Sequence, residues 1–162
     1  MNLIFNMSIN REKALKFLKE ADFKAKLFSK DKKRKVGAII LENDSLIQLS
    51  CGYNGLPRKL KETKKRWLKD NKDFYVIHAE TNAIIQASRT NSNINNSIMV
   101  CNRFPCHNCC LNIIQAGIKL LITIEPEWIT LSKKWKKSFY ASKEMLDELK
   151  IDIIFFKESD LL

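Results

Sequence analysis

The chain has 162 residues, of which 45% are hydrophobic and 29% charged, as in an ordinary globular domain with a real core. No apolar run approaches the roughly 18 residues that a membrane helix needs, so the composition excludes a membrane-spanning protein. The net charge of +11 has three explanations: solvated faces, a nucleic-acid partner, or a phosphorylated small substrate. Because the basic residues are scattered along the chain, we expect most of them to lie on solvated faces.

The first half of the chain predicts a helix, a hairpin and a long loop. Apolar residues recur at helical spacing over 10–28, which indicates an amphipathic helix. Two runs at 36–41 and 46–53, separated by a polar turn, predict a β-hairpin. Residues 54–73 are polar and basic, so we expect a long loop there, with a short helix around Trp67.

The second half alternates helices and strands. The pattern predicts helices at 78–89, 106–116 and 132–149, and strands at 98–101, 120–124 and 151–156. Such alternation requires crossover connections and some parallel pairing. We therefore expect an α/β protein in which residues 1–162 form a single domain.

Two short clusters carry the chemistry. The sequence His-Ala-Glu at 78–80 places an imidazole two residues before a carboxylate, and Pro-Cys-His-Asn-Cys at 105–109 places two thiols three residues apart. One imidazole and two thiolates fill three corners of a zinc tetrahedron and leave the fourth for water, as in catalytic zinc sites. Zinc lowers the pKa of bound water to about 7. Glu80 is then the natural proton carrier between that water and a leaving group.

We predict that His78, Cys106 and Cys109 bind this zinc. Both clusters fall at predicted helix starts, where exposed N–H groups and the helix dipole favour thiolate over thiol. Two such helices packed side by side on a sheet would bring the imidazole within metal reach of the thiols. Five cysteines, two of them used in this way, fit a reducing compartment better than a disulfide framework.

The clusters also have blander interpretations. The thiols could be unrelated and buried, or they could belong to a closed structural zinc site with a fourth ligand from Cys101, His107 or Cys110. Cys110 lies four residues after Cys106 and shares its helix face, so it is the main rival as a ligand. We expect Cys110 to pack behind the site, and His107 to point away from the metal.

The chain resembles the deoxycytidylate (dCMP) deaminases of the cytidine deaminase superfamily. Four segments match the family pattern in the family order: Val-Gly-Ala-Ile-Ile at 36–40, Gly-Tyr-Asn-Gly at 52–55, His-Ala-Glu-Thr-Asn-Ala-Ile at 78–84 and Gln-Ala-Gly-Ile at 115–118. The zinc clusters are common to most of the superfamily and identify the chemistry. The Gly-Tyr-Asn-Gly segment points to the dCMP branch.

This resemblance implies a three-layer α/β/α sandwich around a five-stranded mixed sheet, and hydrolysis of dCMP to dUMP and ammonia. It implies that Asn54 holds the sugar. The N–H of Ala79 and the carbonyl of Pro105 would meet the base edge. Ser29 and Lys35 flank the segment that in the family lies near the substrate phosphate.

The resemblance also bears on partners and cofactors. It implies a homo-oligomer, a dimer or a hexamer, that acts on a small nucleotide and needs no membrane. Some members hold a second zinc in the loop after Gly-Tyr-Asn-Gly, but this loop has neither Cys nor His, so we expect one Zn²⁺ per subunit. Lys32 and Lys59 stand where the family often has proline and glycine, and the altered basic loop leaves regulation by dCTP and dTTP open.

Two other functions compete with this one. An enzyme acting on a polynucleotide, tRNA or single-stranded DNA, is supported by the charge and by Trp67, Trp128 and Trp135, which could stack bases. Helix packing is the blander role for Trp135, since Phe139 follows four residues later. A non-catalytic nucleotide-binding relative would not need Glu80. We expect a cytoplasmic protein, because the apolar run at 1–5 is too short and lacks the basic start of a secretory signal.

Overall fold

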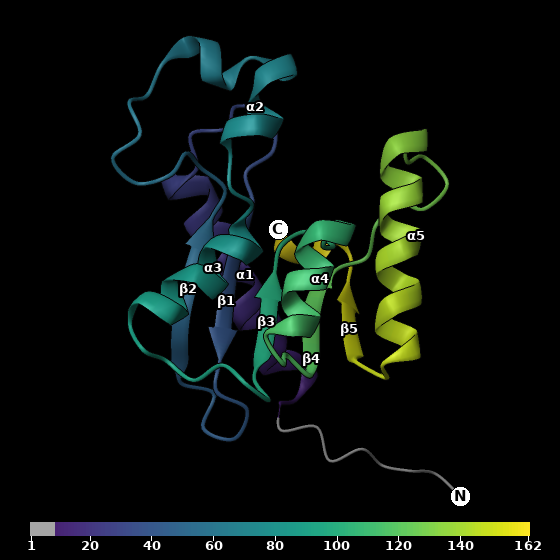
Figure 1. The fold of residues 1–162 in the computed structure, drawn as a ribbon. Coiled ribbons are helices and arrows are strands. Elements are labelled where there is room, and N and C mark those ends of the chain that lie inside the picture. The colour runs from purple at the N-terminus through teal and green to yellow at the C-terminus, as the bar shows by residue number, and fades with distance from the viewer. Residues whose placement is uncertain (1–8) are drawn as a thin grey trace, which may run out of the picture.

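Five strands form one mixed sheet in the order β2-β1-β3-β4-β5 in the computed structural model (Figure 1). The structure describes residues 9–162, so the apolar run at 1–5 lies outside the described residues. The strands are β1 Gly37–Leu41, β2 Gln48–Tyr53, β3 Ile98–Cys101, β4 Leu120–Ile124 and β5 Asp152–Phe156. The α-helices are α1 Arg11–Phe28, α2 Lys69–Tyr75, α3 Ala79–Arg89, α4 His107–Gln115 and α5 Lys133–Glu148.

The pairing of the strands follows from the lengths of their connections. The short turn between β1 and β2 gives the predicted antiparallel hairpin, and β1 also pairs antiparallel with β3. The helical crossovers through α4 and α5 make β3, β4 and β5 parallel, as the alternation of helices and strands requires. The sheet is therefore mixed, and the predicted fold class is confirmed.

Two apolar layers hold the sandwich together. Helix α1 packs on one face of the sheet through Ala14, Leu18 and Ala21, which meet the side chains of alternate strand residues. Helices α3, α4 and α5 cover the other face, where Ala83 and Ile113 lie in the same cluster as the intervening strand residues (Figure 1). Strands with every residue buried, such as β3 and β4, read as continuous apolar runs for this reason.

The segment after the hairpin departs from the prediction. We expected a long loop with one short helix around Trp67; the structure has a 3₁₀ helix at Lys64–Trp67 and then the helix α2. Neither helix has a buried residue, so no hydrophobic periodicity marked α2 in the sequence. Another 3₁₀ helix, Glu158–Leu161, follows β5 and was likewise not predicted.

The topology places two helix starts at one edge of the sheet. Strand β3 leads into α4 at the carboxyl ends of the parallel strands, where α/β proteins place their ligands. Helix α3 begins beside α4 on the same face (Figure 1). No helix within residues 9–162 combines the length and the apolar character that crossing a membrane would demand.

Candidate metal centre

The chain is fixed in place immediately before α3. Ile77 exchanges two backbone hydrogen bonds with Gly55, of 2.9 and 3.1 Å, and His78 then caps the helix in an extended conformation. Gly52 of β2 lets α3 lie directly on the sheet, since a Cβ there would come within 2.4 Å of the Ala79 carbonyl oxygen. His78 and Glu80 are therefore held by backbone contacts and not by a mobile loop.

The start of α4 sorts its polar side chains into two directions. Cys106 caps the helix and Cys109 lies in its first turn, both facing α3. His107 turns toward α5, where its backbone N–H and its Nδ1 lie 3.1 and 2.9 Å from the Ser138 hydroxyl. The Cys110 thiol lies 3.6 Å from the Ser142 carbonyl oxygen, on the same side. The structure thus confirms that His107 and Cys110 point away from the candidate centre.

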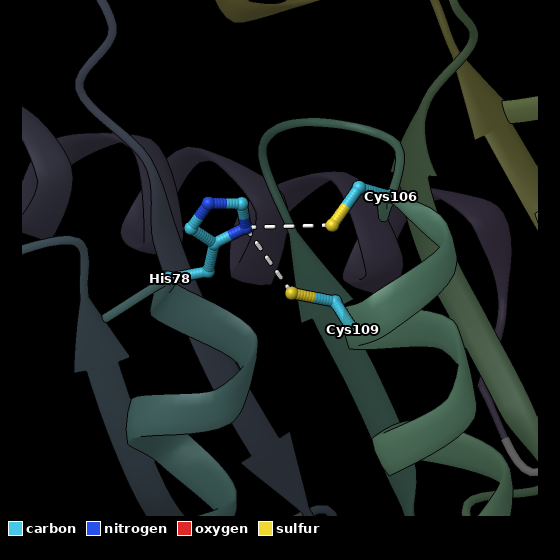
Figure 2. Close-up of side chains that lie close together, drawn as sticks. All are labelled: His78, Cys106 and Cys109. Carbon is cyan, nitrogen blue, oxygen red and sulfur yellow. Dashed lines mark hydrogen bonds between the residues drawn. The ribbon is translucent and has the colours of Figure 1, made fainter. Parts of the chain in front are cut away.

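The three predicted ligands come together across the gap between α3 and α4 (Figure 2). His78 Nδ1 lies 3.5 Å from Cys106 Sγ and 3.3 Å from Cys109 Sγ. A tetrahedral zinc with ordinary bond lengths would place such nitrogen and sulfur atoms about 3.6 Å apart, so the donor set fits zinc in kind and in spacing. Within residues 9–162 no other group of three His, Cys, Asp or Glu side chains has metal-site geometry.

The three candidate ligands shift one another's pKa values through hydrogen bonds and charge. The hydrogen bond from the Cys109 thiol, with that of His78, lowers the pKa of Cys106 to about 4 although burial opposes this. The same hydrogen bond raises the pKa of Cys109, because the Cys109 thiol is the donor and loses this bond when it is deprotonated. The Cys106 thiolate in turn raises the pKa of His78. A divalent ion would replace these protons, because a coordinated thiol is deprotonated.

Glu80 lies beside this group with only 3% of its surface exposed. Burial raises the pKa of its carboxyl above the usual value, against the opposing charge of His78. A raised pKa makes this carboxylate a better proton acceptor than that of an exposed glutamate, which suits a general acid–base group.

The centre forms the floor of a cavity of about 880 Å³. Ala79 and Glu80 line this floor with two of the candidate metal ligands, His78 and Cys106, and aromatic rings of Phe104, Trp128 and Phe139 form a wall. Charged side chains of both signs line the rest of the cavity: Lys33, Arg34, Lys72, Arg103 and Lys157 are basic, and Asp31, Asp73, Glu125, Glu127 and Glu158 are acidic. Lys72 is paired with Asp31 and Arg103 with Glu158, whereas Lys33 and Arg34 have no carboxylate partner within 4.0 Å among residues 9–162. The cavity can therefore take a ligand with a planar apolar body, and Lys33 and Arg34 are available to an anionic group.

Asn54 lines the cavity and organises its edge. Its carboxamide oxygen accepts hydrogen bonds from the Val36 N–H at 2.8 Å and the Ser29 hydroxyl at 2.7 Å. Its nitrogen donates to the Arg34 carbonyl at 2.9 Å. Ser29 is buried behind Asn54 and is not among the lining residues, so it acts on the cavity through Asn54.

Two other predicted substrate contacts are not part of the described cavity wall. The Pro105 carbonyl accepts a hydrogen bond from the Ser142 hydroxyl at 3.0 Å. The Lys35 ammonium donates to the Lys26 carbonyl at the end of α1, 2.9 Å away. Arg103 and Lys157 line the cavity but were not among the predicted site residues. The position of Arg103 just after β3, at the carboxyl end of a strand, could have indicated it. No local pattern marked Lys157.

Known proteins share the sequence clusters that form this candidate metal centre. The family model for the cytidine and deoxycytidylate deaminase zinc-binding region matches residues 11–125, which include both ligand clusters. A probable deoxycytidylate deaminase of Caenorhabditis elegans is 36% identical over 129 residues, 77% of this chain and 60% of the relative. The deoxycytidylate deaminase of Homo sapiens is 36% identical over 106 residues, 62% of this chain and 58% of the relative. The chain thus spans less than two thirds of the length of these curated relatives.

A solved structure has the same architecture. The crystal structure of dCMP deaminase from the cyanophage S-TIM5 in apo form superposes with a TM-score of 0.71 at 25% identity. The match covers 91% of this chain and 100% of the cyanophage chain.

Proposed function

The chain belongs to the cytidine and deoxycytidylate deaminase family, and from this premise we propose that it is a zinc-dependent hydrolase converting dCMP to dUMP and ammonia. One observation carries the proposal: a His-Cys-Cys group with the spacing of a zinc site lies beside the buried Glu80 at the floor of a cavity. Relatives at 30–36% identity are named deoxycytidylate deaminases.

The chemistry follows from the roles of the residues at the floor. His78, Cys106 and Cys109 would hold the zinc, which would supply a nucleophilic water at neutral pH by lowering the pKa of that water to about 7. Glu80 would take one proton of the attacking water on a carboxylate oxygen and deliver it to N3 of the cytosine ring as the C4–O bond forms. It would then carry the proton of the resulting C4 hydroxyl to the amino group, so that the C4–N bond breaks, ammonia leaves and the C4 carbonyl remains. The raised pKa of its carboxyl, caused by burial, strengthens Glu80 as a proton acceptor.

The remaining contacts orient the nucleotide. The Ala79 N–H, in the first residue of α3, would meet the base edge, and Asn54 has one amide N–H left that would hold the sugar. The phosphate would lie at the rim, against Lys33 and Arg34. Ser29 secures that segment through Asn54. Lys35 secures its other end by the hydrogen bond to α1.

The aromatic side chains favour a mononucleotide over a polynucleotide. The Trp67 indole N–H donates to Glu62 at 3.1 Å, and the Trp128 ring packs against Phe104 and Tyr140 with centroids 5.7 and 5.2 Å away. The Trp135 ring packs on Phe139 as the spacing predicted, with centroids 5.5 Å apart. Each ring makes contacts within the protein, and Trp128 and Trp135 also line the cavity, where they can meet a single base. This arrangement supports a mononucleotide substrate over a row of stacked bases.

Ammonia release from a substrate panel tests the proposal. We expect dCMP to be deaminated with a kcat/KM about 100-fold or more above that of deoxycytidine, because charge-assisted hydrogen bonds hold only the former's phosphate. CMP and a single-stranded oligodeoxynucleotide complete the panel. Equal rates on dCMP and deoxycytidine would contradict the substrate assignment. Deamination within the oligonucleotide at the dCMP rate would instead favour the polynucleotide function.

We further propose that the protein is a single deaminase domain that works as a cytoplasmic homo-oligomer, a dimer or a hexamer. Apolar side chains exposed near the end of α1, including Phe23 and Leu27, adjoin the stacked rings of Phe28 and Tyr53 and support association. All five thiols are free, in accord with a reducing compartment. Light scattering after size-exclusion chromatography would measure the mass, and a monomer at micromolar concentration would contradict the assembly.

A further inference from the structure

Two serines lie on the buried face of α5, where apolar side chains would be expected. The buried residues of this helix are Ser138, Ser142 and Leu146, which are spaced four residues apart and therefore share one face. Ser142 is 0% and Ser138 9% exposed. A buried hydroxyl is unfavourable unless it is hydrogen-bonded, so packing alone does not account for two serines at these positions.

Both serines face the start of α4, which lies beside α5 (Figure 1). The Ser142 hydroxyl donates to the Pro105 carbonyl oxygen at 3.0 Å. The Ser138 hydroxyl accepts from the His107 backbone N–H at 3.1 Å. These two backbone groups belong to the peptide bonds on either side of Cys106. The backbone of this candidate ligand is thus held from both sides by side chains of another helix.

The remaining polar atoms of the two serines are also engaged near Cys106. The Ser142 hydroxyl lies 3.1 Å from the Ser138 carbonyl oxygen as well, so its one proton is shared between α5 and the chain before α4. The Ser138 hydroxyl can donate its own proton to His107 Nδ1, 2.9 Å away, when this ring nitrogen carries no proton. The Cys110 thiol lies 3.6 Å from the Ser142 carbonyl oxygen. These contacts all fall within about one turn of the candidate ligand.

The start of α4 requires such partners from outside the helix. An α-helix leaves its first N–H groups without a partner of its own, and that of His107 is the first of them in α4. Cys106 is the N-cap residue, but its side chain is directed to the candidate metal centre (Figure 2). Ser138 therefore gives this N–H group an acceptor across the interface between the helices, in the place of a capping side chain.

We propose that Ser138 and Ser142, the serine clamp, are positioning residues that fix the backbone of Cys106 so that its sulfur points at the metal. The inference rests on the proposed function, since it takes Cys106 as a zinc ligand. Groups that hold a metal ligand in its orientation typically contribute about 10–100-fold to metal affinity or activity. Because Trp135 and Phe139 on the same helix line the cavity, α5 would also keep the apolar wall and the metal ligand in one fixed relation.

Zinc affinity of the Ser138→Ala, Ser142→Ala double variant, measured against a chromophoric chelator, tests the clamp. We expect this affinity to fall about tenfold or more. With Co²⁺ in place of zinc, the visible absorption bands, which depend on the geometry of the ligands, should shift in the double variant. The described wall of the cavity includes neither serine, so kcat for dCMP should fall while KM stays within about threefold.

Ser97→Ala is the matched control. The Ser97 hydroxyl is also buried and donates to a backbone carbonyl, that of Ile94 at 2.6 Å, but it precedes β3, at the end of the strand opposite to the candidate metal centre. This variant should be less stable than the wild type but keep its zinc affinity and cobalt spectrum. Wild-type affinity and spectrum in the double variant would overturn the proposal, as would an equal loss in Ser97→Ala.

Amide hydrogen exchange of the metal-free protein gives a reading that depends on neither zinc nor activity. The His107 N–H should exchange about fivefold faster in Ser138→Ala than in the wild type or in Ser97→Ala. Equal exchange in all three would overturn the clamp. This single variant also keeps the test decisive if Ser142→Ala does not fold, because Ser138 lies at the margin of the buried face.

Failure of the proposed function has a different signature. The wild type would then bind zinc without deaminating dCMP, while the zinc affinity and the cobalt bands of the double variant would still differ from those of Ser97→Ala. A wild type that takes up no zinc would overturn both proposals.

Discussion

The floor of the cavity and its roof are built on different principles. At the floor, Glu80 is 3% and Cys109 2% exposed, and both lie at the starts of helices packed on the sheet. The roof is the segment 56–76, whose two helices have no buried residue and whose Phe74 is 83% exposed. It is tied to the body by polar pairs: Lys72–Asp31, Lys30–Glu62, Arg58–Gln86 and Lys134–Asp73.

Because the floor and the roof are held by different interactions, the geometry of the metal centre and the access to the cavity can vary independently. Packing positions the groups that we propose to bind the metal and carry the proton, so their geometry changes only if the core changes. Surface ion pairs hold the roof, and each contributes little and is screened by salt. A segment with few apolar contacts opens locally at low free-energy cost. The roof can therefore alter access and affinity while the chemistry at the floor stays the same.

The largest effect is expected from removing a ligand at the floor. Cys109→Ala should abolish zinc binding and with it turnover, because two protein ligands remain. Metal analysis of the purified protein measures the zinc content. Cys110→Ala is the matched control, since its thiol faces Ser142 and should leave one zinc per subunit in place. Zinc retained in Cys109→Ala but lost in Cys110→Ala would reverse the assignment of the ligand.

Glu80→Gln should have the next largest effect. The amide keeps the shape of the side chain but cannot carry a proton, so turnover should fall by about 10²–10⁴-fold or more. Zinc content and the unfolding midpoint should stay close to those of the wild type. Steady-state ammonia release with dCMP gives the rate, and a loss below tenfold would rule out this role of Glu80.

Gly52→Ala should disturb the floor through packing alone. The added Cβ would lie 2.4 Å from the Ala79 carbonyl oxygen and 2.5 Å from the Ala83 nitrogen, so α3 must move. Overpacking of this kind costs about 1–3 kcal/mol of unfolding free energy, and the shift should also weaken zinc binding. Urea denaturation and a zinc-chelator competition measure both.

Gly55→Ala provides the control from the same segment. A Cβ at this position finds no atom nearer than 3.7 Å, so the stability should change by less than about 0.5 kcal/mol. Equal losses in the two variants would show that the close approach of α3 to β2 does not position the metal centre.

Lys72→Gln should weaken the attachment of the roof to the body of the protein, and its effect on activity should be the smallest of those considered. Its pairing with the buried Asp31 carboxylate should contribute about 1–2 kcal/mol, and its loss should speed proteolysis within 56–76. Lys143→Gln, which breaks an i,i+4 pair with Asp147 on α5, should cost about 0.5 kcal/mol or less. Urea unfolding and limited trypsin digestion compare the two, and equal digestion rates would exclude the tie.

The pH dependence of the same pair has a definite sign. Burial alone would raise the pKa of Asp31, but hydrogen bonds from Lys72 and from the backbone N–H groups of Lys33 and Arg34 outweigh it and lower the pKa. The stabilisation is then fully present above the unfolded-state pKa of about 3.9 and is lost as the pH falls through the lower folded-state value. The stability difference between wild type and Lys72→Gln should therefore persist from pH 7 to pH 5 and shrink below about pH 4.

The sequence by itself determined the order of the strands and main helices along the chain, and it placed both ligand clusters at helix starts. Strand β4 occupies its predicted residues, and α1, α3 and α5 begin within a residue of theirs. These features are local: hydrophobic periodicity reports which face is buried, and a motif reports which ligands are close along the chain. The metal centre was therefore predictable before its two halves were seen to meet.

Only the tertiary structure decided how the rim of the cavity is built. Asp31 and Lys72 are 41 positions apart, and Asn54 reaches back 18 positions to Val36. Lys35, expected near the phosphate, is instead drawn to the end of α1, while Arg34 beside it faces the cavity. Exposed charged side chains carry no periodic signal, and a single residue's shift along an extended segment changes the direction in which it points. The chemistry at the floor was thus legible in the sequence, whereas the surface that selects and admits the ligand emerged only from the packing of distant segments.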